Sequence, residues 1–419
     1  MLVKKAPHSS LPYQLLLFLI SPLLAFVNSV KHIHKREHFW IVLLFALFFS
    51  YTYIPWPESD AYRYKEKFET LNNYDFTKYI NDVQSMYNGQ GKDQDMYVST
   101  IQLLVSPFTN DVRVYWLVLG FIYYYTFLSL IKKILITNIK RTIKFNWFII
   151  GIVFIISFTG GINGVRWPLA LMVFLLGSYQ YITTSKIKFI LLASLSPLIH
   201  FVFFYSVIFL FLYVLTKKYY NPKITSLLVL GGFFLSTFLV SGIKSNIGII
   251  GESVSEKSSA YIENETWKEQ RIEGFQSMNW YVKLQRSTPY YFAVLSLFIT
   301  TYFSFNLKKS SITIALQYFT LLSFLASFLA SQLLVDTDNR YTINAMALCF
   351  IYLYHLFNEN PENRMLNVLN KIYMPLAILT VLVTMRADLY TVSPNLVFGN
   401  IFTEMFYRFD ENIQELVGL

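Results

Sequence analysis

The sequence is poor in cysteine and lacks the short motifs that mark common nucleotide and zinc sites. Its single cysteine, Cys349, lies in an apolar stretch, so the residues exclude an intramolecular disulfide and a cysteine-based metal site. No Walker motif, His-Glu-x-x-His motif or Gly-x-Ser-x-Gly motif occurs. We therefore expect no cofactor and no metal ion.

Charged residues are also scarce, at 14% of the chain against 54% hydrophobic residues. A membrane-spanning helix needs about 20 mostly apolar residues, and many segments qualify. They are 11–30, 39–55, 112–131, 145–159, 166–184, 223–243, 289–306, 312–335, 341–357 and 371–387. The pattern predicts an all-α polytopic membrane protein, a single bundle over residues 1–419 with about 10–12 transmembrane helices.

The remaining charges are distributed unequally between the two sides of this bundle. One set of connections, within 31–37, 132–144, 186–188, 217–223, 308–309 and 359–371, carries 17 of the 35 basic residues but three of the 25 acids. Lysine and arginine in short loops mark the cytoplasmic side. The net charge of +10 is therefore a topology signal and argues against nucleic-acid binding. With 11–30 as an uncleaved first span, kinked at Pro22, the N-terminus is expected outside.

The opposite side carries the longer connections. We expect outer loops at about 56–111 and 244–288 that carry interfacial helices, and an outer tail over 389–419. Segment 186–218 has lysines at both ends and is too short for two spans of about 20 residues each. It is therefore expected to form a broken or re-entrant hairpin, with His200 near its tip beside a cavity.

Two arginines begin predicted spans at the outer surface. Arg166 follows Gly160-Gly161-Ile162-Asn163-Gly164, whose glycines end one helix before the next one begins. A cation gains nothing from the dipole at a helix N-terminus, so Arg166 is expected to serve a bound anion; the alternative is an arginine that anchors lipid headgroups. Arg340 follows the short turn that contains Asp338. It either points into the bundle or forms a local ion pair with Asp338.

Further polar residues collect at the same face. His200 is the only histidine inside an apolar segment, and either a functional group or a buried imidazole bonded to backbone would explain it. Carboxylates and aromatic rings near the surface suit a sugar platform, although an ordinary aromatic belt is the alternative. The residues of this patch are Asp60, Tyr62, Arg63 and Tyr64. Arg271 and Arg286 of the second outer loop are weaker candidates.

Together these motifs resemble the EpsG-like, Wzy-type polysaccharide polymerases that build O-antigen or capsule from repeat units. The matching positions are Asp60 with Tyr64, Asn163 with Arg166, His200, and Arg340 with Tyr341. Trp167 and Val202 depart from the family pattern, which commonly has Gln after the motif arginine and often a small hydroxyl residue two positions after the histidine.

The resemblance implies a glycosyltransferase of the bacterial inner membrane, with its active site facing the periplasm. A growing glycan on undecaprenyl pyrophosphate would move to a sugar hydroxyl of a second lipid-linked oligosaccharide. Its partners would be these donor and acceptor lipids, the membrane and a chain-length regulator protein. Asp60, His200 or Asp338 would take the acceptor proton, and Arg166, Arg340, Arg271 and Arg286 would bind pyrophosphate. Tyr62, Arg63, Tyr64, Asn163 and Tyr341 would position the sugar.

Two other function classes remain open at the level of the residues. A flippase or other transporter would place charges near the bilayer midplane, often in repeated halves. A membrane acyltransferase would want a catalytic histidine facing its acyl donor. The concentration of arginines and acids at one surface favours the polymerase.

Overall fold

The computed structural model is all helical over the residues that it describes. These are 10–57, 59–70, 74–87, 96–137, 160–244, 273–307, 309–333, 340–409 and 411–417. The predicted span 145–159 lies outside them, as do Asp338 and Arg271. No strand occurs within the described residues, which agrees with the predicted all-α class.

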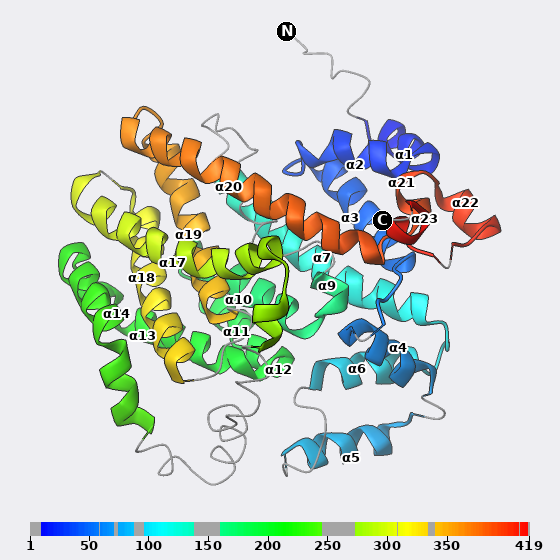
Figure 1. Ribbon diagram of the computed structural model, residues 1–419, viewed down its shortest axis with the longest axis horizontal. Helices are drawn as coiled ribbons and strands as arrows, with labels where there is room; N and C mark the ends of the chain where they lie inside the picture. The colour runs from blue at the N-terminus through cyan, green and yellow to red at the C-terminus, as the bar shows by residue number, and fades with distance from the viewer. Residues whose placement is uncertain are drawn as a thin grey trace.

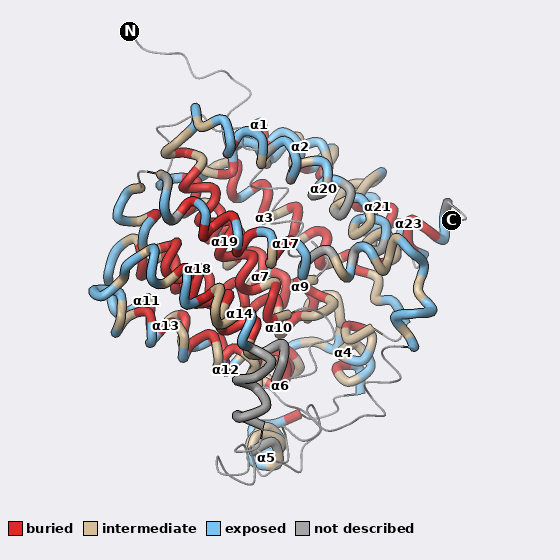
Figure 2. The backbone as a smooth tube through the Cα atoms, turned by 60° about the vertical axis from the view of Figure 1, so that its left-hand side comes forward, coloured by how far each residue is buried: buried red, intermediate tan, exposed pale blue. Residues whose placement is uncertain are grey.

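Long helices form the body of the molecule. The N-terminal group contains α3 (Arg36–Tyr51), α7 (Val112–Thr137) and α10 (Arg166–Thr184), packed in that order. The second group contains α13 (Phe204–Thr216), α14 (Pro222–Lys244), α17 (Trp280–Asn306), α18 (Ser311–Leu333), α19 (Arg340–Glu359) and α20 (Arg364–Asp388). Contact between α10 and α18 joins the groups into one bundle, and the buried residues concentrate along α3, α7, α10, α18 and α19 (Figures 1 and 2).

Three helices in the described part of the chain are long and apolar enough to cross a membrane. They cover Val112–Thr137, Phe201–Tyr219 and Ser311–Leu329. Several other apolar helices are shorter, among them Lys188–Ile199 and Tyr290–Phe303. The structure thus fits a polytopic membrane protein, and the count of about 10–12 spanning helices stays a prediction.

The predicted first span is divided into two helices that lie side by side. They are α1 (Leu11–Ile20) and α2 (Pro22–Val30), and Ser21 between them has an extended backbone. The Gln14 side chain accepts hydrogen bonds from Asn28 at 3.3 Å and from Ser29 at 3.2 Å. In one straight helix these groups would be about 20 Å apart. The expectation of a single kinked helix is therefore wrong, because the break at Ser21-Pro22 folds α1 back on α2 (Figure 1).

Segment 186–218 contains short helices on either side of His200. They are α11 (Lys188–Ala193), α12 (Ser196–Ile199), the 3-10 turn η2 (Phe201–Phe203) and α13. Both α11 and α12 pack along α10. Gly177 of α10 allows the backbone of α11 to approach closely. A Cβ on Gly177 would lie 2.5 Å from the Ala193 nitrogen and 2.7 Å from the Phe189 oxygen. The C-terminal end of the segment is bonded to α10, because the Lys217 ammonium donates to the Tyr181 hydroxyl at 2.9 Å.

The first predicted outer loop contains three helices: α4 (Asp60–Glu69), α5 (Phe76–Tyr87) and α6 (Met96–Val105). Ser59 caps α4, as expected, by accepting from the Tyr62 amide at 3.1 Å. In the tail, α21 (Pro394–Val397), α22 (Ile401–Phe406) and α23 (Ile413–Val417) follow α20. Figure 1 shows this tail beside α1 and α2, and a hydrogen bond from the Asn400 amide to the Ile20 carbonyl, 3.5 Å long, agrees with it.

Candidate functional site

Arg166 is the first residue of α10, as the sequence predicted. The preceding helix, α9 (Gly160–Asn163), packs against α7. A Cβ on Gly161 would lie 2.0 Å from the Tyr123 ring, so only glycine permits this approach. The glycine motif therefore fixes the position at which α10 begins, and with it the height of Arg166 in the bundle.

Asn163 joins this junction to the first outer loop. Its side-chain oxygen accepts from the Ala61 amide at 3.5 Å, at the start of α4. Because α4 also packs against α7 and α9, the acidic-aromatic patch of the loop is held beside Arg166. The sequence predicted that Asn163 would position the sugar. In the structure its side chain bonds the start of α4 and so positions that helix.

The side chains of α4 differ in what they contact. The Asp60 carboxylate pairs with Arg63, one turn later, and both side chains are substantially exposed, at 38% and 68%. Tyr64 is half-buried, and burial raises the pKa of its phenol. The nearby Arg166 guanidinium opposes that shift, whereas the Asp60 carboxylate adds to it. Tyr64 is therefore close enough to both predicted charges for each to act on its phenol. Tyr62 is half-buried on the same helix.

His200 occupies the turn between α12 and η2. Its side chain is 6% exposed, and its ring stacks on Phe201 with a centroid distance of 5.5 Å. The Val202 amide donates to Nδ1 at 3.4 Å. No hydrogen bond to Nε2 occurs among the described residues.

Arg340 is the first residue of α19, and the helix behind it is firmly fixed. The Asn344 amide donates to the Tyr205 hydroxyl at 3.1 Å and to the Ser206 hydroxyl at 2.6 Å. The Tyr341 ring is buried against Tyr205, with centroids 4.9 Å apart. These contacts tie α19 to α13, the helix that follows His200.

The structure brings three predicted residues together. Arg166 and Arg340 are the two cations whose charges act on the His200 imidazole. They come from three separate parts of the chain: the start of α10, the turn before α13 and the start of α19. Two guanidinium groups close enough to act on one imidazole are chemically suited to an anion with several oxygens.

The other predicted pyrophosphate ligands do not add to this cluster in the described residues. Arg286 lies on the second turn of α17, where it is exposed. Arg271 and the predicted base Asp338 lie outside the described residues. No group of three or more metal-ligating side chains occurs within the described part of the chain.

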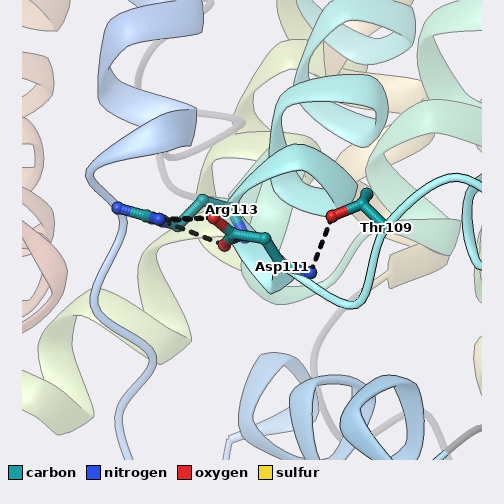
Figure 3. Close-up of polar contacts among 3 residues, drawn as sticks. All are labelled: Thr109, Asp111 and Arg113. Carbon is teal, nitrogen blue, oxygen red and sulfur yellow. Dashed lines mark hydrogen bonds and ion pairs between the residues drawn. The ribbon is translucent and has the colours of Figure 1, made fainter.

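Sequence reasoning missed an ion pair at the outer end of α7. Arg113 donates to the Asp111 carboxylate through Nε, 2.9 Å from each oxygen, and Asp111 also accepts from the Arg113 amide (Figure 3). These bonds hold the pKa of the Asp111 carboxyl below its ordinary value. The Arg113 guanidinium also lies over the Tyr51 ring, 5.1 Å from its centroid. The pair fixes the end of the first outer loop to α3 and α7, and its two-residue spacing is the signal that could have found it.

Comparison with known proteins agrees with the resemblance noted in the sequence. No curated protein and no solved structure matches the chain. The model of the EpsG family matches residues 38–396, a range that begins within α3, ends within α21 and includes Arg166, His200 and Arg340. The chain belongs to the EpsG family.

Proposed function

We propose that this multi-pass membrane protein is a glycosyltransferase that polymerises undecaprenyl-pyrophosphate-linked oligosaccharides on the outer leaflet of the bacterial inner membrane. Family membership supports a polysaccharide polymerase in general terms. The observation that carries the specific mechanism is the convergence of Arg166, His200 and Arg340. The charge asymmetry of the loops supports an outward-facing site.

The reaction replaces one bond at the anomeric carbon of the donor glycan. The acceptor sugar's hydroxyl oxygen attacks that carbon, and the bond to the lipid pyrophosphate breaks with its electron pair leaving on the phosphate oxygen. Negative charge then grows on the leaving group. Arg166 and Arg340 would bind that group in a bidentate manner and stay charged while doing so.

The hydrogen bond of His200 supports a particular role in this step. Because Nδ1 accepts from the Val202 amide, we assign the ring proton to Nε2. A neutral imidazole in this tautomer donates from Nε2 and has no free lone pair. We therefore infer that His200 donates a hydrogen bond to the leaving pyrophosphate and is not the base of the resting enzyme.

The acceptor proton would then pass to a carboxylate. Asp60 lies on the helix that Asn163 holds beside Arg166, and its pairing with Arg63 is exposed and can open to substrate. Asp338, two residues before Arg340, is the second candidate from the sequence. Tyr62 and Tyr64 would provide aromatic surface for the sugar, and a chain-length regulator protein is a further proposed partner.

Purified protein in lipid nanodiscs, supplied with the lipid-linked repeat units extracted from its own cells, tests this proposal. A polymerase produces a ladder of longer glycans and releases undecaprenyl pyrophosphate in proportion. An Arg166→Ala variant of normal folding should lose both products. Transfer of the lipid-linked substrate across the bilayer with no ladder would instead indicate a flippase.

A further inference from the structure

Helix α6 buries polar side chains together with apolar ones and turns one leucine outward. Leu104 is 59% exposed, whereas Ser99 and Gln102 are buried at 4% and 0%. These two lie three residues apart and therefore share one face of the helix. Such a helix is suited to a position between lipid and a polar interior.

The amide of Gln102 lacks the partners that a buried amide normally has. Among the described residues, neither its Nε2 nor its Oε1 has a hydrogen-bond partner, and both atoms are fully buried. The hydroxyl of Ser106, one turn later, is also buried and has no hydrogen-bond partner in the described part of the chain. Gln14 is equally buried, yet it accepts from both Asn28 and Ser29. An unpartnered buried amide is costly and requires an explanation.

The position of α6 brings this helix next to the segment that leads into His200. The helix packs against α7 and against α12, which ends at Ile199, directly before His200. Figures 1 and 2 both show α6 close to α4 and α12. On its other side, the Tyr79 hydroxyl of α5 bonds Thr100 at 3.1 Å. Gln102 is thus buried on a helix that contacts α5, α7 and α12.

We propose that the Gln102 amide binds hydroxyl groups of the sugar next to the reacting centre and determines which repeat unit is accepted. This inference rests on the proposed polymerase function. A primary amide offers two donors and an acceptor in one plane, a set that matches neighbouring hydroxyls on a pyranose ring. A site built around such a group rejects analogues that lack the hydroxyl, because its polar atoms then remain unpaired.

The test compares Gln102→Met with Gln14→Met, since methionine has nearly the shape of glutamine and no amide. Gln102→Met should melt at the wild-type temperature or above it, because the unpartnered group is removed. Its KM for the cell's own lipid-linked repeat units should rise at least tenfold. Gln14→Met should instead melt at a lower temperature, because it leaves Asn28 and Ser29 without their acceptor.

Two binding measurements separate this inference from the function on which it rests. The probes are undecaprenyl pyrophosphate and the free oligosaccharide released by mild acid from the same lipid-linked repeat units. We expect Gln102→Met to bind the oligosaccharide at least tenfold more weakly and undecaprenyl pyrophosphate as wild type does.

The remaining outcomes overturn the inference in distinguishable ways. An unchanged KM with unchanged oligosaccharide binding would show that a structural water satisfies Gln102, and the polymerase function would stand. A lower melting temperature with unchanged KM would give the amide a packing role. A wild-type protein that binds no oligosaccharide and makes no polymer would overturn the function and this inference together.

Discussion

At the scale of single residues, a backbone amide determines what the His200 side chain can do. The sequence allowed a base or a structural imidazole, and it could not distinguish them because the choice depends on the partner of Nδ1. The Val202 amide is that partner. A histidine whose Nδ1 is an acceptor presents a donor on its opposite side.

This assignment predicts an order among His200 variants. Glutamine places an amide near Nε2 and can still donate, whereas asparagine reaches the position of Nδ1. A hydrogen bond to a charged group is worth about 1.5–3 kcal/mol, or roughly one to two decades in rate. We expect His200→Gln to keep kcat within about tenfold of wild type. His200→Asn and His200→Ala should fall further in the same polymerisation assay. A glutamine variant as inactive as the alanine variant would restore His200 to the role of base.

At the scale of helices, the sequence predicted several starts correctly. The Ser59 cap, the start of α10 at Arg166 and the start of α19 at Arg340 follow from local signals of one to four residues. The folding of α1 on α2 could not be predicted in this way, because the bonds of Gln14 join residues 14 and 15 positions apart. The unpartnered amide of Gln102 was equally hidden, since it depends on how α6, α7 and α12 pack.

The contact between α10 and α11 gives a prediction for Gly177. A methyl group there would meet the backbone of α11 at 2.5 Å, which side-chain movement cannot relieve. Gly177→Ala should therefore lower the free energy of unfolding by about 1–3 kcal/mol, as measured by thermal or denaturant unfolding in detergent. Activity should fall as well, because α11 and α12 lead into the turn that carries His200.

Gly231 in α14 provides the matched control, because nothing lies within 4 Å of a Cβ built there. Gly231→Ala should leave stability unchanged or raise it by up to about 1 kcal/mol through helix propensity. Equal effects of the two alanine variants would show that the close approach at Gly177 is not the cause.

A pH dependence is expected at the turn between α17 and α18. Burial lowers the pKa of Lys309 to about 8, and Glu359 only partly opposes the shift. Glu359 itself accepts from the Ser310 amide and the Thr313 hydroxyl. Because the folded state binds the Lys309 proton less tightly than the unfolded state, stability should rise with pH above about 8, up to the ordinary lysine pKa.

The measurement is the melting temperature of wild type minus that of Lys309→Met across that pH range. This difference should become more positive as pH rises, because the wild-type protein gains stability relative to the variant. A difference that is constant with pH would mean that Lys309 titrates normally in the folded protein.

At the scale of the whole molecule, the sequence identified the class and the family through composition and four short motifs. The gathering of charges at one membrane face stays a prediction. In the structure, Arg166 and Arg340 come from distant parts of the chain and both act electrostatically on His200. The exposed position of Arg286 required the structure.

The hairpin of α1 and α2 changes the expected topology. Two helices of about 15 Å that fold back on each other cannot carry the chain across a bilayer of about 30 Å. The residues before Leu11 should therefore lie on the same side as the basic turn at Lys31. The positive-inside rule favours the same side, because this N-terminal stretch includes Lys4 and Lys5.

Reporter fusions measure this topology directly. Fusions at residue 10 and at 138, 310 and 364 should read cytoplasmic, and fusions at 90, 260 and 400 should read outside. An outside reading at residue 10 alone would show that α1 and α2 open into one span. A cytoplasmic reading at 90 or 260 would place the proposed site on the wrong leaflet.

The central claim is that Arg166 and Arg340 hold one leaving pyrophosphate, and a double-mutant cycle of polymerisation rates tests it most directly. Lysine lacks the planar guanidinium, so Arg166→Lys and Arg340→Lys should each slow transfer at least about tenfold. If both arginines bind the same anion, their effects are not independent. The fold-decrease in rate of the double variant should then be much smaller than the product of the two single fold-decreases. Near-normal single variants, or single effects that simply multiply, would contradict the claim that the two arginines share one anion.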